Sequence, residues 1–176
     1  MTPPTLDVRR SPYFLIALTV LVADQGSKAL ASAMLRGHDT VVVVPGFFNL
    51  VYSRNRGGLF GYFSGMADPW RTILLTVFPL LAVGLIAWFL GRGSETDRPT
   101  LLGLGLILGG AAGNLIDRVF RGSVVDFLDV YIAPSRIAGW FIDQFGTAHW
   151  PTFNIADSGI VVGACLLLLT IFRRDE

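Results

Sequence analysis

The sequence predicts an all-α integral membrane protein: a four-transmembrane-helix bundle with a small extracytoplasmic β-sheet and an outer loop that carries a short interfacial helix. The chain has 176 residues, of which 52% are hydrophobic and 15% charged, and its mean hydropathy is +0.58. Ordinary soluble domains carry about 25% charged residues. The net charge of +1 does not indicate a nucleic-acid partner. Four uncharged, largely apolar runs occupy residues 11–23, 72–91, 99–116 and 158–172.

Three of the four predicted spans are long enough as they stand. A helix needs about 20 apolar residues to cross roughly 30 Å of hydrocarbon. The spans at 71–91, 99–117 and 153–172 meet this length, provided that Asp157 is tolerated in the last one. Pro79 is expected to kink the second span rather than end it.

The first span depends on two charged residues. It reaches spanning length over residues 12–35 only if the helix continues through Asp24 and Lys28. The alternative is a cleavable signal peptide, because Arg9 and Arg10 precede an apolar core that small residues follow. Since a signal peptide is normally uncharged where Asp24 and Lys28 lie, we expect a retained helix. The whole chain, residues 1–176, is then a single membrane-embedded domain.

Arginine positions favour cytoplasmic termini. Four spans place both termini on one side, and the short segments there contain Arg9, Arg10, Arg92, Arg98, Arg173 and Arg174. An excess of basic residues next to helix ends marks the cytoplasmic side. The opposite side would hold Arg36, Arg54, Arg56, Arg71, Arg121 and Arg136. The prediction therefore requires other roles for these outer arginines.

The two segments between spans on the outer side differ in pattern. Residues 41–63 contain a β-branched run, a Pro-Gly turn and a second strand-like run, which predict a small sheet. Residues 120–152 form an outer loop with an aromatic patch, and an interfacial helix is predicted near 137–145.

Glycines recur every four residues in the third span, at Gly105, Gly109 and Gly113. Small residues on one helical face allow two helix backbones to approach closely in a membrane. The alternative, a dinucleotide-binding loop, requires a preceding strand and a different glycine spacing. The pattern therefore predicts helix packing.

Charged residues stand at the edges of the apolar runs. A charge near the bilayer core costs roughly 3 kcal/mol, so such residues usually face the protein interior and mark a functional site. Asp126 and Asp157 are lone acids in apolar surroundings on the predicted outer side. Two carboxylates that share one proton can hydrolyse an amide bond. The alternative is that each acid caps a helix or pairs with an arginine, and spacing alone does not decide between them.

Five short motifs resemble those of one family. Asp24-Gln25-Gly26-Ser27-Lys28 resembles D-Q-x-x-K, and residues 55–60 resemble N-x-G-x-x-F. Residues 113–118 are similar to G-N-x-x-D-R, 124–127 to V-V-D-F and 153–157 to F-N-x-A-D. In this order, at the edges of four spans, they resemble the bacterial lipoprotein signal peptidases (signal peptidase II), which are intramembrane aspartyl peptidases.

The resemblance implies a function and a location. Members are multi-pass proteins of the bacterial inner membrane with cytoplasmic termini and an active site near the outer leaflet. They remove signal peptides from diacylglyceryl-modified prolipoproteins by cleavage before the lipidated cysteine, without a metal or cofactor. Membrane lipid and cyclic peptide antibiotics of the globomycin type are the other expected partners.

Residue roles follow from the matching motifs. The catalytic pair would be Asp126 and Asp157. Residues that bind substrate or support the pair would be Asn55, Gly57, Asn114, Arg118, Asn154, Asp24, Lys28 and Asp117. The stretch between Asp126 and Phe153 is longer than in typical members, and Arg56 replaces a small polar residue, so the role of each is open.

Two other functions remain alternatives. An ion- or proton-coupled membrane transporter would use the acids as a relay, but residues 72–91 contain no ionisable side chain. A structural or assembly protein would use the acids only as buried ion pairs.

Overall fold

The computed structural model describes residues 10–56, 63, 65–92 and 97–174. Gly57, expected in the site, lies outside the described residues. The elements in chain order are α1 (Ser11–Met34), β1 (Val41–Val44), β2 (Phe48–Asn55), α2 (Asp68–Thr72), the π-helical turn η2 (Ile73–Val77), α3 (Phe78–Arg92), α4 (Arg98–Arg121), β3 (Val124–Val130), α5 (Arg136–Phe145) and α6 (Ile155–Arg174).

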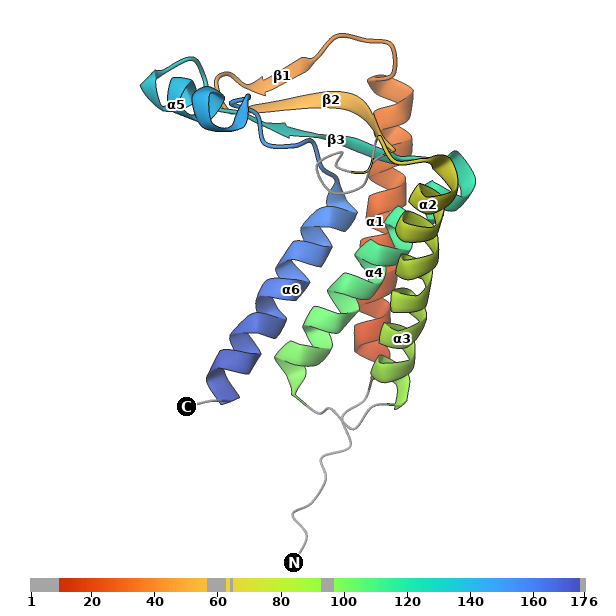
Figure 1. The fold of residues 1–176 in the computed structure, drawn as a ribbon. Coiled ribbons are helices and arrows are strands. Elements are labelled where there is room, and N and C mark those ends of the chain that lie inside the picture. Colours follow the sequence, from red (N-terminus) through yellow and green to blue (C-terminus); the bar gives the residue numbers. More distant parts are fainter. Residues whose placement is uncertain (1–9, 57–62, 64, 93–96, 175–176) are drawn as a thin grey trace, which may run out of the picture.

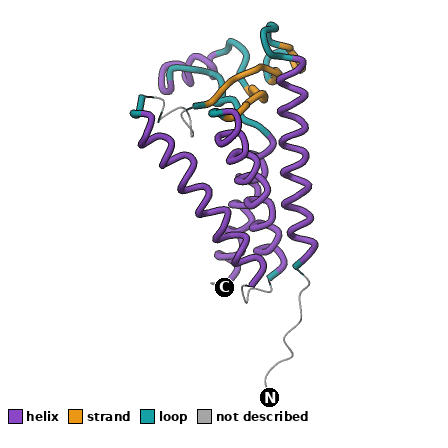
Figure 2. The backbone as a smooth tube through the Cα atoms, turned by 90° about the vertical axis from the view of Figure 1, so that its right-hand side faces the viewer, coloured by secondary structure: helices purple, strands orange, loops and turns teal. Residues whose placement is uncertain are grey.

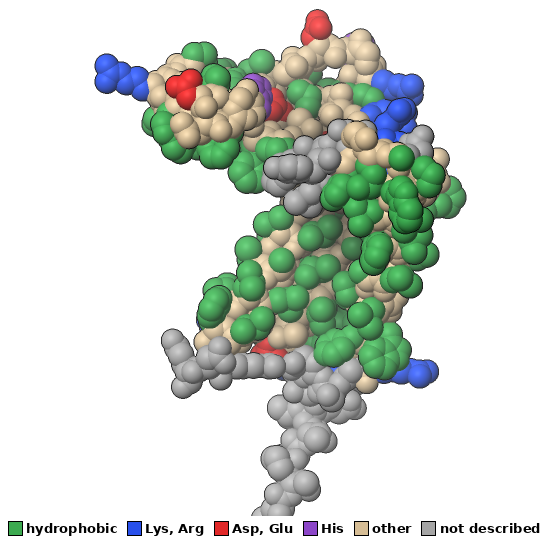
Figure 3. Space-filling view, in the orientation of Figure 1, with side chains coloured by type: hydrophobic (Ala, Val, Ile, Leu, Met, Phe, Trp, Pro, Cys, Tyr) green, Lys and Arg blue, Asp and Glu red, His purple; other side chains and the backbone are tan. Residues whose placement is uncertain are grey.

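Four helical segments are long and apolar enough to cross a membrane, which confirms the predicted bundle. They are Ser11–Met34, Pro69–Arg92, Arg98–Arg121 and Ile155–Arg173. Apolar side chains cover the helices in the space-filling view, and charged side chains gather toward the two ends (Figure 3). The chain is therefore a multi-pass membrane protein.

The second span is continuous but irregular. It joins α2, η2 and α3, and Pro79 lies in the first turn of α3. Proline cannot donate the backbone hydrogen bond that would normally reach Leu75. The wider π turn at η2 lies where that bond is lost.

α4 packs between α1 and α6, and glycine contacts make both approaches possible. A Cβ atom on Gly105 would lie 2.8 Å from the Tyr13 carbonyl oxygen of α1. Gly109 and Gly113 face Ala17 and Asp24 of the same helix, so the predicted packing face is confirmed. The first span is thus an integral part of the bundle.

A second glycine face, which was not expected from the sequence, meets α6. A Cβ atom on Gly103 would lie 2.8 Å from the Gly163 carbonyl oxygen, and Gly110 faces Ala156 in the same way. Because α4 needs close contact on two sides, it has small residues on both.

The sheet has three antiparallel strands in the order β1-β2-β3. The expected sheet covered only residues 41–63, whereas β3 comes from the segment assigned to the outer loop. β3 pairs Asp129 with Asn49 and Asp126 with Ser53. Its first four residues are all buried, so β3 lacks the alternation of a strand with one solvated face.

The sheet and α5 lie at one end of the bundle, and both termini lie at the other (Figures 1 and 2). The predicted interfacial helix is present as α5, where Ser135 accepts a hydrogen bond from the Ala138 amide at 3.1 Å. Ile137, Trp140 and Phe145 of this helix are exposed. This exposed apolar surface is typical of a helix that lies on a membrane interface.

Candidate active site

Backbone pairing brings the two predicted catalytic acids together. The Phe127 and Leu128 amides donate to the Phe153 carbonyl oxygen at 3.0 and 2.9 Å. The Phe153 amide donates in return to Leu128 at 3.0 Å. The residues that precede α6 are therefore fixed alongside β3, which places the first turn of α6 next to Asp126.

Asn154 contacts both acids. Its side-chain Nδ2 donates to Asp126 Oδ1 at 2.7 Å, and its backbone amide donates to Asp157 Oδ2 at 3.2 Å. Its Oδ1 accepts from the Asp157 amide at 3.0 Å, so the two residues form a reciprocal cap at the start of α6. Asp157 therefore caps a helix, as one reading of the sequence predicted. The cap uses only one of the two carboxylate oxygens of Asp157.

Asn114 holds the other oxygen of Asp157. Lys28 Nζ donates to Asn114 Oδ1 at 2.9 Å, which leaves Nδ2 of Asn114 to donate to Asp157 Oδ1 at 2.8 Å. Asn154 Nδ2 also lies 3.3 Å from Asn114 Oδ1. A continuous chain of hydrogen bonds therefore runs from Lys28 through two asparagines to both acids.

The charged residues behind this chain form a buried ion network. Lys28 Nζ lies 2.9 Å from Asp24 Oδ2 and 3.0 Å from Asp117 Oδ2, and all three side chains are 0% exposed. Arg121 also pairs with Asp117, so two cations balance two carboxylates. Buried charges require this kind of pairing, because removing one partner leaves an uncompensated charge.

The network also joins separate elements. Asp24 Oδ1 accepts from the Ala156 amide of α6 at 3.0 Å, and Asp117 Oδ2 accepts from the Val125 amide of β3 at 3.1 Å. Gln25 Nε2 donates to Asp117 Oδ1 at 3.2 Å. The network therefore holds α1, α4, α6 and β3 in the positions that bring the two acids together.

Asp126 lies on β3, outside the spanning helices, and is only 1% exposed. Burial, and then the nearby Asp157 carboxylate, raise its pKa to about 7, while side-chain hydrogen bonds from Asn55 and Asn154 oppose the rise. This carboxyl group therefore titrates near neutral pH, which suits a group that exchanges protons.

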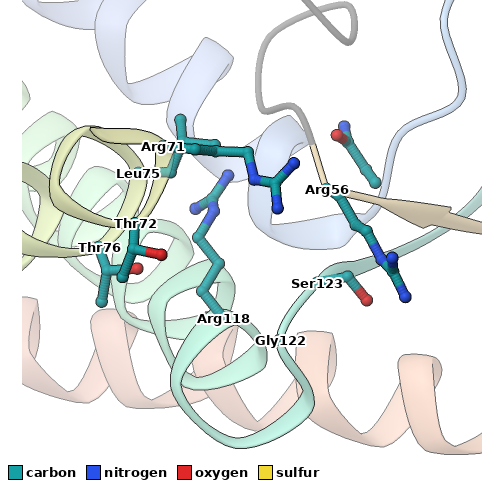
Figure 4. Close-up of a pocket in the computed structure, with 9 residues that line it drawn as sticks. Arg56, Arg71, Thr72, Leu75, Thr76, Arg118, Gly122 and Ser123 are labelled. Atoms are coloured by element: carbon teal, nitrogen blue, oxygen red, sulfur yellow. The ribbon is translucent and has the colours of Figure 1, made fainter. Parts of the chain in front are cut away.

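A cavity of about 110 Å³ is lined by Arg118, which Figure 4 labels, and by Asn55, whose side chain hydrogen-bonds to Asp126. Arg118 is close enough to Asp157 and Asp126 to attract both. Arg56 and Arg71 line the same cavity. The motifs left the role of Arg56 open, and Arg71 was not expected in the site.

The structure brings most of the expected residues into one cluster. Asn55, Asn114 and Asn154 contact the two acids, and the ion network joins the cluster through Lys28. Gln25 and Arg121 were missed as members of this network. Both could have been found from the sequence, because Gln25 lies inside the first motif and Arg121 follows Asp117 by one helical turn.

The fold and the cluster define a small helical membrane protein with a polar, two-carboxylate site at the sheet end of its bundle. A family model described as signal peptidase (SPase) II matches residues 16–173. The chain is 42% identical over 167 residues to a lipoprotein signal peptidase of Solibacter usitatus, and the match covers 95% of this chain and 93% of the relative. It is 36% identical over 170 residues to one of Syntrophus aciditrophicus, with coverage of 95% and 98%.

A solved structure agrees with this similarity. A bacterial membrane enzyme determined by the in meso method at 2.3 Å resolution has a TM-score of 0.77 and 26% sequence identity. The match covers 94% of this chain and 90% of that chain. The chain belongs to the signal peptidase II family and is therefore a membrane peptidase.

Proposed function

We propose that this protein is an aspartyl endopeptidase that removes signal peptides from diacylglyceryl-modified prolipoproteins by cleavage before the lipidated cysteine. Family membership supports a lipoprotein signal peptidase. The observation that carries the aspartyl mechanism is the contact of Asn154 with both Asp126 and Asp157. Family membership and the clustered acids also disfavour the ion-coupled transporter.

The proposed chemistry uses the two carboxyl groups in different protonation states. Asp126, with a pKa of about 7, holds the proton and donates a hydrogen bond to the scissile carbonyl oxygen. Ionised Asp157 removes a proton from water, whose oxygen attacks the carbonyl carbon. The C–N bond then breaks as the leaving nitrogen gains a proton from the pair. The reaction needs only water and side chains.

Other polar groups have supporting roles in this proposal. A substrate helix hides its backbone amides in internal hydrogen bonds, so the cleaved segment must become extended. Asn55 and Arg118 line the cavity, and in this proposal they form hydrogen bonds with the exposed backbone groups. A cyclic peptide of the globomycin type would compete for the same groups.

The proposed location is the bacterial inner membrane, with cytoplasmic termini and the site near the outer leaflet. Cytoplasmic termini require other roles for the outer arginines, and two of these arginines have such roles. Arg54 Nε donates to Ser123 Oγ at 2.7 Å, and Arg121 pairs with Asp117. These arginines support the fold at the sheet end and so do not contradict the orientation.

The test is cleavage of a synthetic diacylglyceryl-modified prolipoprotein by purified protein. Asp126→Asn and Asp157→Asn should each lower the turnover number by roughly 10²–10⁴-fold, because each removes one proton-transfer group. Asp143→Asn is the matched control, since Asp143 is exposed on α5, and it should keep wild-type turnover. Wild-type turnover by either site variant refutes the proposed pair.

A further inference from the structure

The cavity beside the acids has a strongly cationic wall. Three arginines from separate elements line it: Arg56 after β2, Arg71 in α2 and Arg118 in the last turn of α4. Three hydroxyl side chains also line it: Thr72, Thr76 and Ser123. None of the nine lining residues that the structure describes is acidic.

This composition matches one kind of ligand. A guanidinium group presents a planar set of donors that binds phosphate oxygens in pairs. Arg71 and Arg118 extend toward each other from α2 and α4 (Figure 4). Hydroxyl groups supply further donors to the same oxygens.

The volume of the cavity and its depth in the membrane indicate which anion binds there. One water molecule needs about 10–15 Å³ of such space, so a cavity of about 110 Å³ holds a group as large as a phosphate. Arg71 lies near the sheet-side end of the span Pro69–Arg92, next to Trp70, which is 67% exposed. Tryptophan is enriched at the level of lipid headgroups. A phospholipid phosphate is therefore the anion available at this depth.

We propose that the Arg56–Arg71–Arg118 cavity binds the phosphate group of a membrane phospholipid. The binding goes beyond the proposed peptidase function, because it uses no proton transfer by Asp126 or Asp157. Since Asn55 and Arg118 also belong to the site, the bound headgroup lies next to the acids. Because the proposed function assigns Asn55 and Arg118 to the peptide substrate, lipid binding is measured without substrate and peptide cleavage in a separate assay.

The experiment measures lipid retention by native mass spectrometry on delipidated, full-length protein in detergent. The protein is titrated with phosphatidylglycerol, with diacylglycerol of the same chains, and with inorganic phosphate as a competitor. Arg56→Gln/Arg71→Gln is the test variant. Arg36→Gln/Arg136→Gln is the matched control, because both arginines are exposed and neither lines the cavity. Arg56→Lys/Arg71→Lys keeps the charge but removes the planar donor pairs.

Phosphatidylglycerol should bind the wild-type protein and the control equally, and retention of diacylglycerol, which lacks the phosphate, should not depend on the arginines. The Gln variant should retain the lipid at least roughly tenfold less well, because it loses the charge-assisted contacts of two arginines, and the Lys variant should lie between. Competition by inorganic phosphate would show that free phosphate also enters, and absence of competition identifies the lipid as the source. Equal retention of phosphatidylglycerol by the Gln variant and the control, or an equal loss of diacylglycerol and phosphatidylglycerol in the Gln variant, overturns the proposal. Because the cleavage assay is independent, inactive Asp→Asn variants that still retain lipid leave this result unchanged.

Discussion

At the scale of single residues, the ionised form of Asp126 is electrostatically unfavourable in the folded protein. Its carboxyl group is buried beside a second acid, and both conditions disfavour the ionised form. Two asparagine hydrogen bonds offset part of this cost. The arrangement suits proton transfer near neutral pH, but it makes the folded protein less stable when Asp126 ionises.

Asp126→Asn should stabilise the protein, and more so at pH 8 than at pH 4.5. The ordinary pKa of 3.8 rises to about 7 in the folded state, so the folded state holds the proton more tightly than the unfolded chain does. Stability from this group is therefore lost as pH rises between these values. A difference of about 1 kcal/mol would raise the midpoint of thermal unfolding by about 2–4 °C.

Thermal unfolding in detergent at both pH values measures the effect. Asp143→Asn, an exposed acid with the same chemical change, should shift the midpoint at neither pH. An equal shift of the Asp126 variant at both pH values would show that ionisation of Asp126 does not limit stability.

At the scale of elements, α4 depends on close approach to its neighbours. Its glycines face α1 on one side and α6 on the other. In a membrane, such contact replaces the hydrophobic effect as a main source of helix association. The polar residues near its end then connect the same helices through the ion network around Lys28.

Gly109→Leu should destabilise the bundle, because the added side chain would overlap the backbone of Ala17 on α1. Overpacking of this kind typically costs about 1–3 kcal/mol, and it should lower the midpoint of thermal unfolding. Gly84→Leu is the control, since a Cβ atom there would meet nothing within 4 Å. If both variants unfold at the same temperature, the packing role of Gly109 is wrong.

At the scale of the whole molecule, the two ends of the bundle are different. The sheet, α5 and the two acids lie at one end, and the termini lie at the other (Figure 1). This asymmetry assigns the site to one face of the membrane. The proposed orientation makes that face the outer one.

Two labels test this orientation in a Cys165→Ser background, which removes the one native cysteine. A cysteine introduced by Gln144→Cys on exposed α5 should react with a membrane-impermeant maleimide in intact spheroplasts. A fluorescent protein fused to the C-terminus should be protected from added protease until the membrane is permeabilised. The reverse pattern for both labels would place the site on the cytoplasmic side.

The sequence by itself determined the four spans, the glycine face of α4 toward α1 and the helix α5. These features depend on local composition and on a bilayer of nearly constant thickness, so length, hydropathy and helical periodicity are sufficient. The motif resemblance also pointed to the family that the comparisons confirm.

Only the tertiary structure decided how the site is assembled. Strand β3 finds its partner far back in the sequence, at β2, and Phe153 joins its other edge. The contact of Asn154 with both acids follows from that pairing and from the helix packing, and so does the presence of Arg56, Arg71 and Arg118 around one cavity. No local pattern encodes them, because each depends on the distance between residues that are remote along the chain.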